Sequence, residues 1–372
     1  MNMVEWKKLG EVCTNLDYKR KPITSSKRVA GAYPYYGASG IVDYVEDYIF
    51  DGEFLLVSED GANLIARSNP IAFTIQGKSW VNNHAHVLEF DNKITQKFVE
   101  LYLNKIDLSP WINGAAQPKL NQANLNIIGI PVPSLEEQQR IVSILDTFTS
   151  SISNLKQQIE ERRKQYEYER DLLLDLEGKE EKDIHSWGEC CEIKKGNGVQ
   201  KADFVEEGIG CIHYGQIYTY YGTYTYTTNK FVAKGTFEKA KKASKGDIIM
   251  TDTSENVEDI CKSVAYLGED DIAVSNHALI LKHHQNPLFL SFSTQTNSFL
   301  TQKRKVVVGA KVSCIKPELF AQIKIYLPSL QEQSRIVSIL DTFEASIKNL
   351  EEQLALREKQ YEYYRNKLLT FE

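Results

Sequence analysis

The chain has 372 residues, a length that favours two or three domains over a single core. Hydrophobic residues make up 42% and charged residues 25%, as in globular proteins, and no apolar run approaches the ~20 residues of a membrane span. The formal net charge of −6 excludes a uniformly basic protein, although the acidity is concentrated in residues 135–177 and 328–372. The six cysteines show no CxxC spacing, so we expect reduced thiols, no zinc site and a cytoplasmic protein.

Residues 1–132 contain short β-like runs separated by turn residues: YPYYGASGIVDYV, FLLVSEDGANL, IAFTI and HAHVLEF. One helix is predicted near residues 96–103. The block ends in NIIGIPVP, an apolar run typical of a strand that leads into the next element. These features predict a first mixed α/β (α+β) domain.

Residues 133–177 are predicted to form a long helix. Ser134 is a candidate N-cap with Glu137 as a possible capping partner, and no proline and no glycine follow for about 40 residues. Apolar residues recur at heptad spacing, at Ile141, Leu145, Phe148, Ile152, Leu155 and Ile159.

Residues 178–327 again contain β-like runs, including CIHYGQIYTYYGTYTYTTNKFV, GDIIMTD and HALILKH, with one helix predicted near residues 288–300. The block ends in IKIYLP. It shares landmarks with the first block: Asn83-His84-Ala85 corresponds to Asn276-His277-Ala278. We therefore predict a second, related α/β domain with a different surface.

Residues 328–372 repeat residues 133–177 without a gap, and roughly two thirds of the positions are identical. Ser329 is the second candidate N-cap, with Gln333 nearby. The apolar heptad positions are Ile336, Leu340, Phe343, Ile347, Leu350 and Leu354. Each helix would be about 60 Å long. Because such a stripe needs a partner helix, we expect the two copies to pair as a coiled coil. The dipeptide Gly-Ala at 114–115 recurs at 309–310, so the repeat extends over half of the chain.

Both apolar stripes end at an arginine that is followed by a tyrosine. Two interpretations remain open: a solvated helix end, or a docking surface for a partner protein, for which Arg and Tyr are favoured residue types. The candidate partner-binding residues are Arg162, Tyr166, Tyr168, Arg357, Tyr361 and Tyr363.

Motifs of enzyme chemistry are absent from the sequence. KKGNGVQ is not a dinucleotide-binding loop, and Asn286-Pro287-Leu288-Phe289 lacks the second proline of the catalytic loop of amino-methyltransferases. His84 and His86 alternate along one predicted strand and could be metal ligands, but we interpret them as ordinary strand residues because no cysteine or carboxylate partner is evident for them. We therefore predict no catalytic residue, no metal and no cofactor bound to this chain.

Basic residues cluster at 17–28, 239–245 and 302–311, all within the two variable blocks. Lys and Arg can neutralise phosphates, and nearby polar and aromatic side chains can reach base edges. The candidate DNA-binding residues are Lys19, Arg20, Lys21, Lys27, Arg28, Tyr36, Ser39, Lys119, Tyr214, Gln216, Lys241, Lys242, Lys303, Arg304 and Lys305.

The helix entries PSLEEQQRIVSILD and PSLQEQSRIVSILD, with YGASGIVDYV and HYGQIYTYYG, make the whole chain resemble the specificity subunit of type I restriction-modification systems. The resemblance implies two target-recognition domains, residues 1–132 and 178–327, each reading half of a split double-stranded DNA target. It also implies that residues 133–177 and 328–372 pack antiparallel as a spacer with pseudo-twofold symmetry.

The same resemblance implies partners. The two helices would dock two modification subunits that carry S-adenosylmethionine and methylate adenine N6, and restriction subunits would add ATP- and Mg-dependent translocation and cleavage. Two alternatives remain at this stage: a protein–protein adaptor, and a methyltransferase with an unrecognised cofactor loop.

Overall fold

The computed structural model describes residues 4–114, 117–309 and 312–371; Ala115, Ala310 and Lys311, on which parts of the Gly-Ala and basic patterns rest, lie outside these described residues. The chain divides into two compact units. Unit 1 comprises Met1–Lys156 and Glu352–Glu372, and unit 2 comprises Gln157–Glu351. Each unit therefore contains one variable block, the first part of one long helix and the last part of the other.

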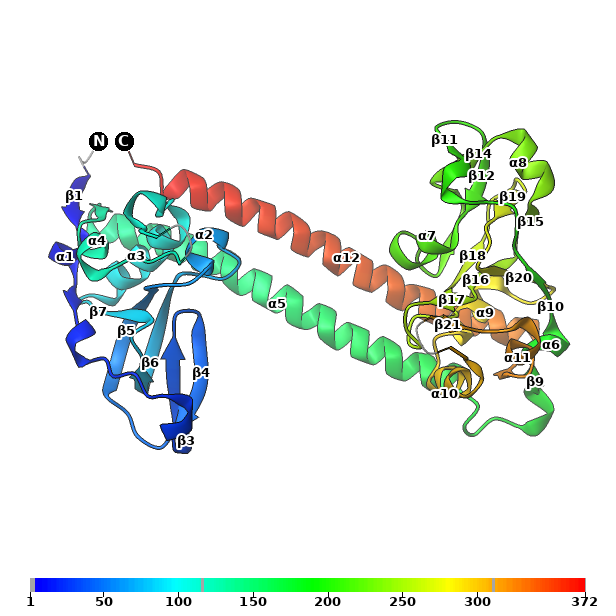
Figure 1. The fold of residues 1–372 in the computed structure, drawn as a ribbon, viewed down its shortest axis with the longest axis horizontal. Helices are drawn as coiled ribbons and strands as arrows, with labels where there is room; N and C mark the ends of the chain where they lie inside the picture. The colour runs from blue at the N-terminus through cyan, green and yellow to red at the C-terminus, as the bar shows by residue number, and fades with distance from the viewer. Residues whose placement is uncertain (1–3, 115–116, 310–311, 372) are drawn as a thin grey trace. The chain divides into compact units, whose positions relative to one another are not determined.

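Unit 1 is built on a six-stranded sheet in the order β2-β7-β5-β6-β3-β4 (Figure 1). The strands are β2 (Thr14–Asn15), β3 (Ala30–Gly37), β4 (Gly40–Val45), β5 (Phe50–Ser58), β6 (Ala72–Val81) and β7 (Ala85–Glu89). β3 runs parallel to β6, and all other neighbours are antiparallel. A separate antiparallel pair joins β1 (Glu5–Lys8) to β8 (Gly129–Val132).

The helices of unit 1 lie mainly on one side of this sheet. The helices are α1 (Leu9–Val12), α2 (Asn63–Ala66), α3 (Lys93–Lys105) and α4 (Gln122–Asn126), with 3-10 turns at Asp17–Lys19, Ser25–Lys27 and Ser109–Trp111. Side chains alternate along β5: Leu55 and Val57 pack with α3, whereas Phe54 and Leu56 belong to a smaller cluster on the opposite face. This alternation is the period-2 arrangement of a strand that is buried on both faces.

Unit 2 contains the same five-strand arrangement and a second sheet. The first sheet has the order β10-β20-β16-β18-β13, and the second has the order β11-β14-β12-β19-β15. The strands are β9 (Ile184–Ser186), β10 (Cys191–Lys195), β11 (Phe204–Val205), β12 (Ile209–Ile212), β13 (Tyr224–Thr225), β14 (Lys230–Val232), β15 (Lys241–Ala243), β16 (Ile248–Thr251), β17 (Thr253–Ser254), β18 (Ser263–Tyr266), β19 (Ile272–Val274), β20 (Ala278–His283), β21 (Ser313–Cys314) and β22 (Lys324–Tyr326).

The first sheet of unit 2 reproduces the sheet of unit 1 in order and direction. β10, β20, β16 and β18 are antiparallel neighbours, and β13 runs parallel to β18, as β3 does to β6. The pair β22–β9 matches the pair β1–β8. The two units thus share one fold, to which unit 1 adds β4 and unit 2 adds a whole sheet.

The shorter helices of unit 2 correct two predictions. They are α6 (Trp187–Cys190), α7 (Tyr214–Thr219), α8 (Lys234–Lys239), α9 (Pro287–Ser293), α10 (Asn297–Val306) and α11 (Pro317–Phe320), with 3-10 turns at Glu181–Asp183 and Lys201–Asp203. The single helix predicted near 288–300 is two helices, because the Thr296 side chain caps a new start by accepting from the Phe299 N–H. Residues 214–219 were predicted as part of a β-like run but form α7, because Gln216 and His213 cap its first turn reciprocally.

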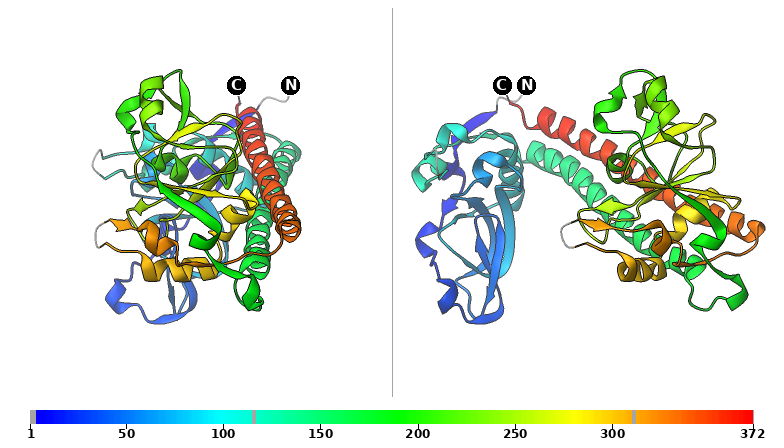
Figure 2. Two further views of the ribbon diagram at one scale, coloured as in Figure 1. Left: turned by 90° about the vertical axis from the view of Figure 1, so that its right-hand side faces the viewer. Right: turned by 45° about the vertical axis from the view of Figure 1, so that its right-hand side comes forward.

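The two long helices are α5 (Leu135–Leu174) and α12 (Leu330–Leu368). In unit 1 the first turns of α5 lie beside the last turns of α12 (Figures 1 and 2). The core of unit 1 contains Leu145 together with Leu369, directly after α12, and the core of unit 2 contains the equivalent residues Leu340 and Leu174. Within each unit the helices are therefore antiparallel, and equivalent positions of the repeat close the two cores.

Ser134 and Ser329 cap the long helices as predicted, accepting from the N–H groups of Glu137 and Glu332. The predicted capping partners are wrong. Glu137 pairs with Arg140 instead, and the Gln333 amide donates to the Pro328 carbonyl at 2.8 Å. Its buried equivalent, Gln138, makes the same bond to Pro133. The glutamine of each helix entry thus binds the helix to the proline between the preceding strand and the helix. In the described part of the chain, no helix has both the length and the apolar character to cross a bilayer.

Candidate nucleic-acid interface

Each unit has a polar corner where the central strand of the shared sheet ends. In unit 1 the first corner consists of Glu59 and Asp60, which follow β5, His84, which precedes β7, and Lys119. The Glu59 N–H donates to the His84 carbonyl at 2.9 Å, and Lys119 forms a β-bridge with Asp60. The His84 ring lies 2.8 Å from the Asp60 carboxylate.

The second corner, in unit 2, has the same backbone and different side chains. It consists of Asp252, Thr253, His277 and Cys314. The Asp252 N–H donates to the His277 carbonyl at 3.1 Å, and Cys314 pairs with Thr253 as Lys119 does with Asp60. One backbone frame therefore presents Asp, His and Lys in unit 1 and Thr, His and Cys in unit 2.

A buried network of charges supports the first corner. Arg20 binds Glu59 at 2.6 Å and Asp17 at 3.1 Å, and Lys119 binds Glu59 at 3.1 Å. Burial alone raises the pKa of Glu59, but Arg20, His86 and Lys119 outweigh it, so the pKa lies below its usual value. Burial likewise opposes the lowered pKa of Asp17, which results chiefly from its hydrogen bond to His86. Both carboxylates are therefore held ionised.

The same network bears on metal binding. Ligand atoms of Asp17, Glu59 and His86 lie within 4.8 Å of one another, so His86 does have carboxylate neighbours, which come from distant parts of the chain. The guanidinium of Arg20 already contacts both carboxylates, and the second ring nitrogen of His86 faces the Leu120 carbonyl at 2.7 Å. The arrangement fits an ion-pair network better than a cation site, because the negative charge is already compensated.

The candidate DNA-binding residues of unit 1 fall into two groups. The Arg20 side chain is 12% exposed within the network, and Arg28 pairs with Asp43 while it covers the ring of Tyr35. Neither fits a free phosphate contact. Another group lies at or beside the first corner: Lys119 belongs to it, and the turn holding exposed Ser39 is tied to β5 by a hydrogen bond from Ser58 to the Ala38 carbonyl. Half-buried Tyr36 is the last residue but one of β3, before that turn, and Lys19, Lys21 and Lys27 are exposed, as Lys119 is.

Unit 2 divides its candidates in the same way. Lys303 is 2% exposed and donates to the carbonyls of Glu258 and Ile260, while burial lowers its pKa. Arg304 pairs with Glu258 at 2.7 Å. Lys303 is therefore structural, contrary to the expectation from sequence. Exposed Lys305 shares helix α10 with both.

Among the other unit 2 candidates, Tyr214 lies beside the second corner. The Tyr214 ring lies 5.3 Å from the His277 ring, and Gln216 is engaged in the α7 cap and with Asn229. Lys241 and Lys242 are exposed on β15, where the Lys241 N–H donates to Asn197. Sequence reasoning missed Lys195, whose ammonium lies 2.8 Å from Asp252. The signal was its place in KKGNGVQ, which spans the end of β10 and the loop that follows.

The candidate partner-binding residues lie along the helix pair. Arg162 stacks over Phe343 at 5.7 Å in unit 2, and Arg357 stacks over Phe148 at 5.6 Å in unit 1. These arginines continue the line of contact between α5 and α12, which we call the seam, and they are not solvated helix ends. Tyr166 is 9% exposed.

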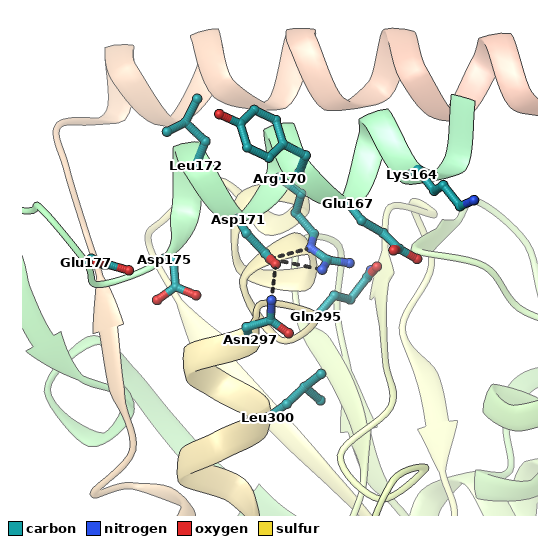
Figure 3. Close-up of a pocket in the computed structure, with 11 residues that line it drawn as sticks. Lys164, Glu167, Arg170, Asp171, Leu172, Asp175, Glu177, Gln295, Asn297 and Leu300 are labelled. Atoms are coloured by element: carbon teal, nitrogen blue, oxygen red, sulfur yellow. Dashed lines mark hydrogen bonds and ion pairs between the residues drawn. The ribbon is translucent and has the colours of Figure 1, made fainter. Parts of the chain in front are cut away.

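Tyr361 is half-buried against the unit 1 core, so among the aromatic candidates only Tyr168 and Tyr363 are exposed. Tyr168 lines an open pocket of ≈ 840 Å³ between the end of α5 and α10 (Figure 3). There Asp171 accepts from Asn297 at 2.6 Å and pairs with Arg170. Four carboxylates face two cations, so the lining is acidic and does not suit a phosphate.

Comparison with known proteins shows the family to which the chain belongs. A family model described as type I restriction modification DNA specificity domain matches residues 3–162 and again residues 179–356. The chain belongs to this family of type I specificity subunits. The double match agrees with the two repeats of the fold.

Comparison with individual relatives supports the same family. A putative type I restriction enzyme specificity subunit of Haemophilus influenzae is 32% identical over 99% of this chain and 96% of its own length. The EcoR124I/EcoR124II specificity subunit of Escherichia coli is 29% identical over 76% of this chain and 72% of its own length. The crystal structure of an M. genitalium S subunit covers 100% of this chain and 98% of its own, with a TM-score of 0.60 at 16% identity, which supports the fold. Family membership supports the specificity-subunit interpretation and not the adaptor.

Proposed function

We propose that this specificity subunit reads a bipartite double-stranded DNA target, one half-site with each recognition domain, and that it performs no catalysis itself. The observation that carries the proposal is the pair of corners: one backbone frame, repeated in both units, displays different side chains. A repeated frame with different side chains suits a protein that reads two different sequences in the same manner.

The exposed lysines would supply the phosphate contacts. Lys19, Lys21 and Lys27 in unit 1, and Lys241, Lys242 and Lys305 in unit 2, are exposed. The corner side chains that are not buried, together with Ser39 and Tyr214, would face the bases; in the corners these are Asp60, His84, Lys119, Thr253, His277 and Cys314. Phosphate contacts give affinity without sequence preference, so the half-sites would depend on the second group.

The long helices would set the unread gap and dock two modification subunits. On this proposal S-adenosylmethionine binds to the modification subunits, which methylate adenine N6, and ATP and Mg bind to restriction subunits. The exposed residues Tyr168 and Tyr363 occupy equivalent positions of the repeat, which suits two copies of one partner. The assembly would act in the cytoplasm of a prokaryotic cell.

The deciding experiment is genome-wide mapping of adenine methylation in cells that contain the chain and its modification partner, compared with cells that lack only this chain. We expect a split motif that disappears on deletion. Methylation that persists unchanged would contradict the proposal.

The spacer role has its own test. Inserting one heptad at equivalent positions of α5 and α12 keeps the seam in register and adds about 10 Å of rise. The preferred gap should lengthen by about three base pairs, at ~3.4 Å each, with both half-sites unchanged. Altered half-sites with an unchanged gap would contradict the spacer role and leave the recognition role intact.

A further inference from the structure

Ion pairs join the two long helices. The residues of these pairs occupy equivalent positions of the repeat, but they are basic in α5 and acidic in α12. In unit 1, Lys156 of α5 lies 3.0 Å from Glu358 of α12. In unit 2, Arg163 of α5 lies 2.5 Å from Glu351 of α12. In the ungapped alignment of the repeats, Lys156 is equivalent to Glu351, and Arg163 is equivalent to Glu358. At both positions α5 is basic and α12 is acidic.

The arginine–phenylalanine contacts between the helices do not distinguish the copies, whereas Glu344, which accepts a hydrogen bond from Tyr166 in unit 2, is replaced by Thr149 in unit 1. Arg162 and Arg357 are equivalent, as are Phe148 and Phe343, and each arginine stacks over the phenylalanine of the other helix. An α5 helix paired with another α5 would retain these stacks. It would place Lys156 against Arg163, and a pair of α12 helices would place Glu351 against Glu358.

We propose that these four residues are a pairing code: α5 accepts an α12 helix, from its own chain or from a second copy, and neither helix accepts a copy of itself. Without these charge differences, the α5 helices of two chains could pair with each other, and so could the α12 helices, because the repeats are nearly identical. The four side chains are 45% to 59% exposed, so each contact is weak. The code works through the difference between two attractive and two repulsive contacts, as charged flanking positions do in coiled coils.

The test uses charge variants of the full chain. E351K/E358R makes all four positions basic and imitates an α5–α5 pair; K156E/R163E makes all four acidic and imitates an α12–α12 pair. The quadruple variant restores opposite signs with the original net charge. The control, E160K/K164E, exchanges an ion pair that lies within α5.

The readout is amide hydrogen exchange of residues 150–165 and 345–360, with the association state measured by light scattering. We expect exchange about tenfold faster in both like-charge variants, and rates near those of the unmodified chain in the quadruple variant and the control. The difference should vanish at about 1 M salt, where the Debye length is ~3 Å. Unchanged exchange in the like-charge variants, or a quadruple variant as labile as they are, would overturn the pairing code. Neither result depends on DNA binding.

Discussion

In unit 1 the face of the shared sheet opposite α3 carries a small apolar cluster, whereas in unit 2 a second five-stranded sheet covers the equivalent face. The other face is alike in both units: α3 and α9 pack there, together with the ends of α5 and α12. The side that packs against the repeated helices is therefore constrained by them. Among the described residues, the apolar clusters of the opposite side include none from α5 or α12, so that side is free to differ, which is where two specificities can diverge.

The largest effect is expected on the face of the sheet that packs against the long helices. Leu145 and Leu340 are equivalent and 0% exposed, each in the core of its own unit. Leu145→Ala and Leu340→Ala should each lower the free energy of unfolding by about 2–5 kcal/mol, because each leaves a cavity. Hydrogen exchange should show the loss in unit 1 for the first variant and in unit 2 for the second. Effects in both units from either variant would contradict separate cores.

A second test concerns the charge network found in unit 1. Arg20→Ala should lower the stability by about 3 kcal/mol, because it removes the cation that the buried carboxylates of Asp17 and Glu59 share. Lys21→Ala, which removes an exposed neighbour, is the matched control and should change the stability by less than about 0.5 kcal/mol. Equal effects in urea denaturation would contradict the structural role of Arg20.

The exposed lysines of the two units should contribute equally to the salt dependence of DNA binding. Replacing Lys19, Lys21 and Lys27 with Gln should reduce the slope of log affinity against log salt by about 3, and replacing Lys241, Lys242 and Lys305 should do the same. Fluorescence anisotropy with the holo-methyltransferase would measure both slopes. An unchanged slope for one set would remove those lysines from the DNA interface.

The helix caps offer a smaller comparison. Ser134→Ala and Ser329→Ala should each reduce stability by about 1 kcal/mol, because each removes the acceptor for one N–H of the first turn. Equal losses in denaturant titrations would confirm that the repeat is used identically. Ser→Gly at the same sites should lose only a few tenths of a kcal/mol.

The smallest expected effect separates the units by pH. Burial raises the pKa of Glu344 in unit 2, whereas the equivalent residue in unit 1 is Thr149. A raised pKa means that Glu344 favours the folded state when protonated, and this contribution is lost as pH rises through the folded pKa. Glu344→Gln should therefore raise the melting temperature at pH 7 relative to its effect at about pH 4. A pH-independent difference would contradict the shift.

Several features of the sequence were sufficient for prediction because they are local. The heptad stripes, serine caps and strand–Pro–helix junctions appear where they were expected. Two predictions of secondary structure were wrong. Residues 288–300 were predicted as one helix, but the Thr296 side chain caps the start of a second helix within them. Tyr214 and its neighbours have strand-like composition, but side-chain caps fold them into α7.

The sequence by itself determined the repeat, its helices, the equivalence of the two halves and, through the helix entries, the resemblance to specificity subunits. Tertiary structure decided which charges are free. Arg20 and Lys303 look like exposed members of basic runs, yet carboxylates and carbonyls from remote segments engage them. The corners were hidden for the same reason: a helix is specified by neighbours three and four residues away, whereas strand ends bring together residues as distant as Asp60 and Lys119.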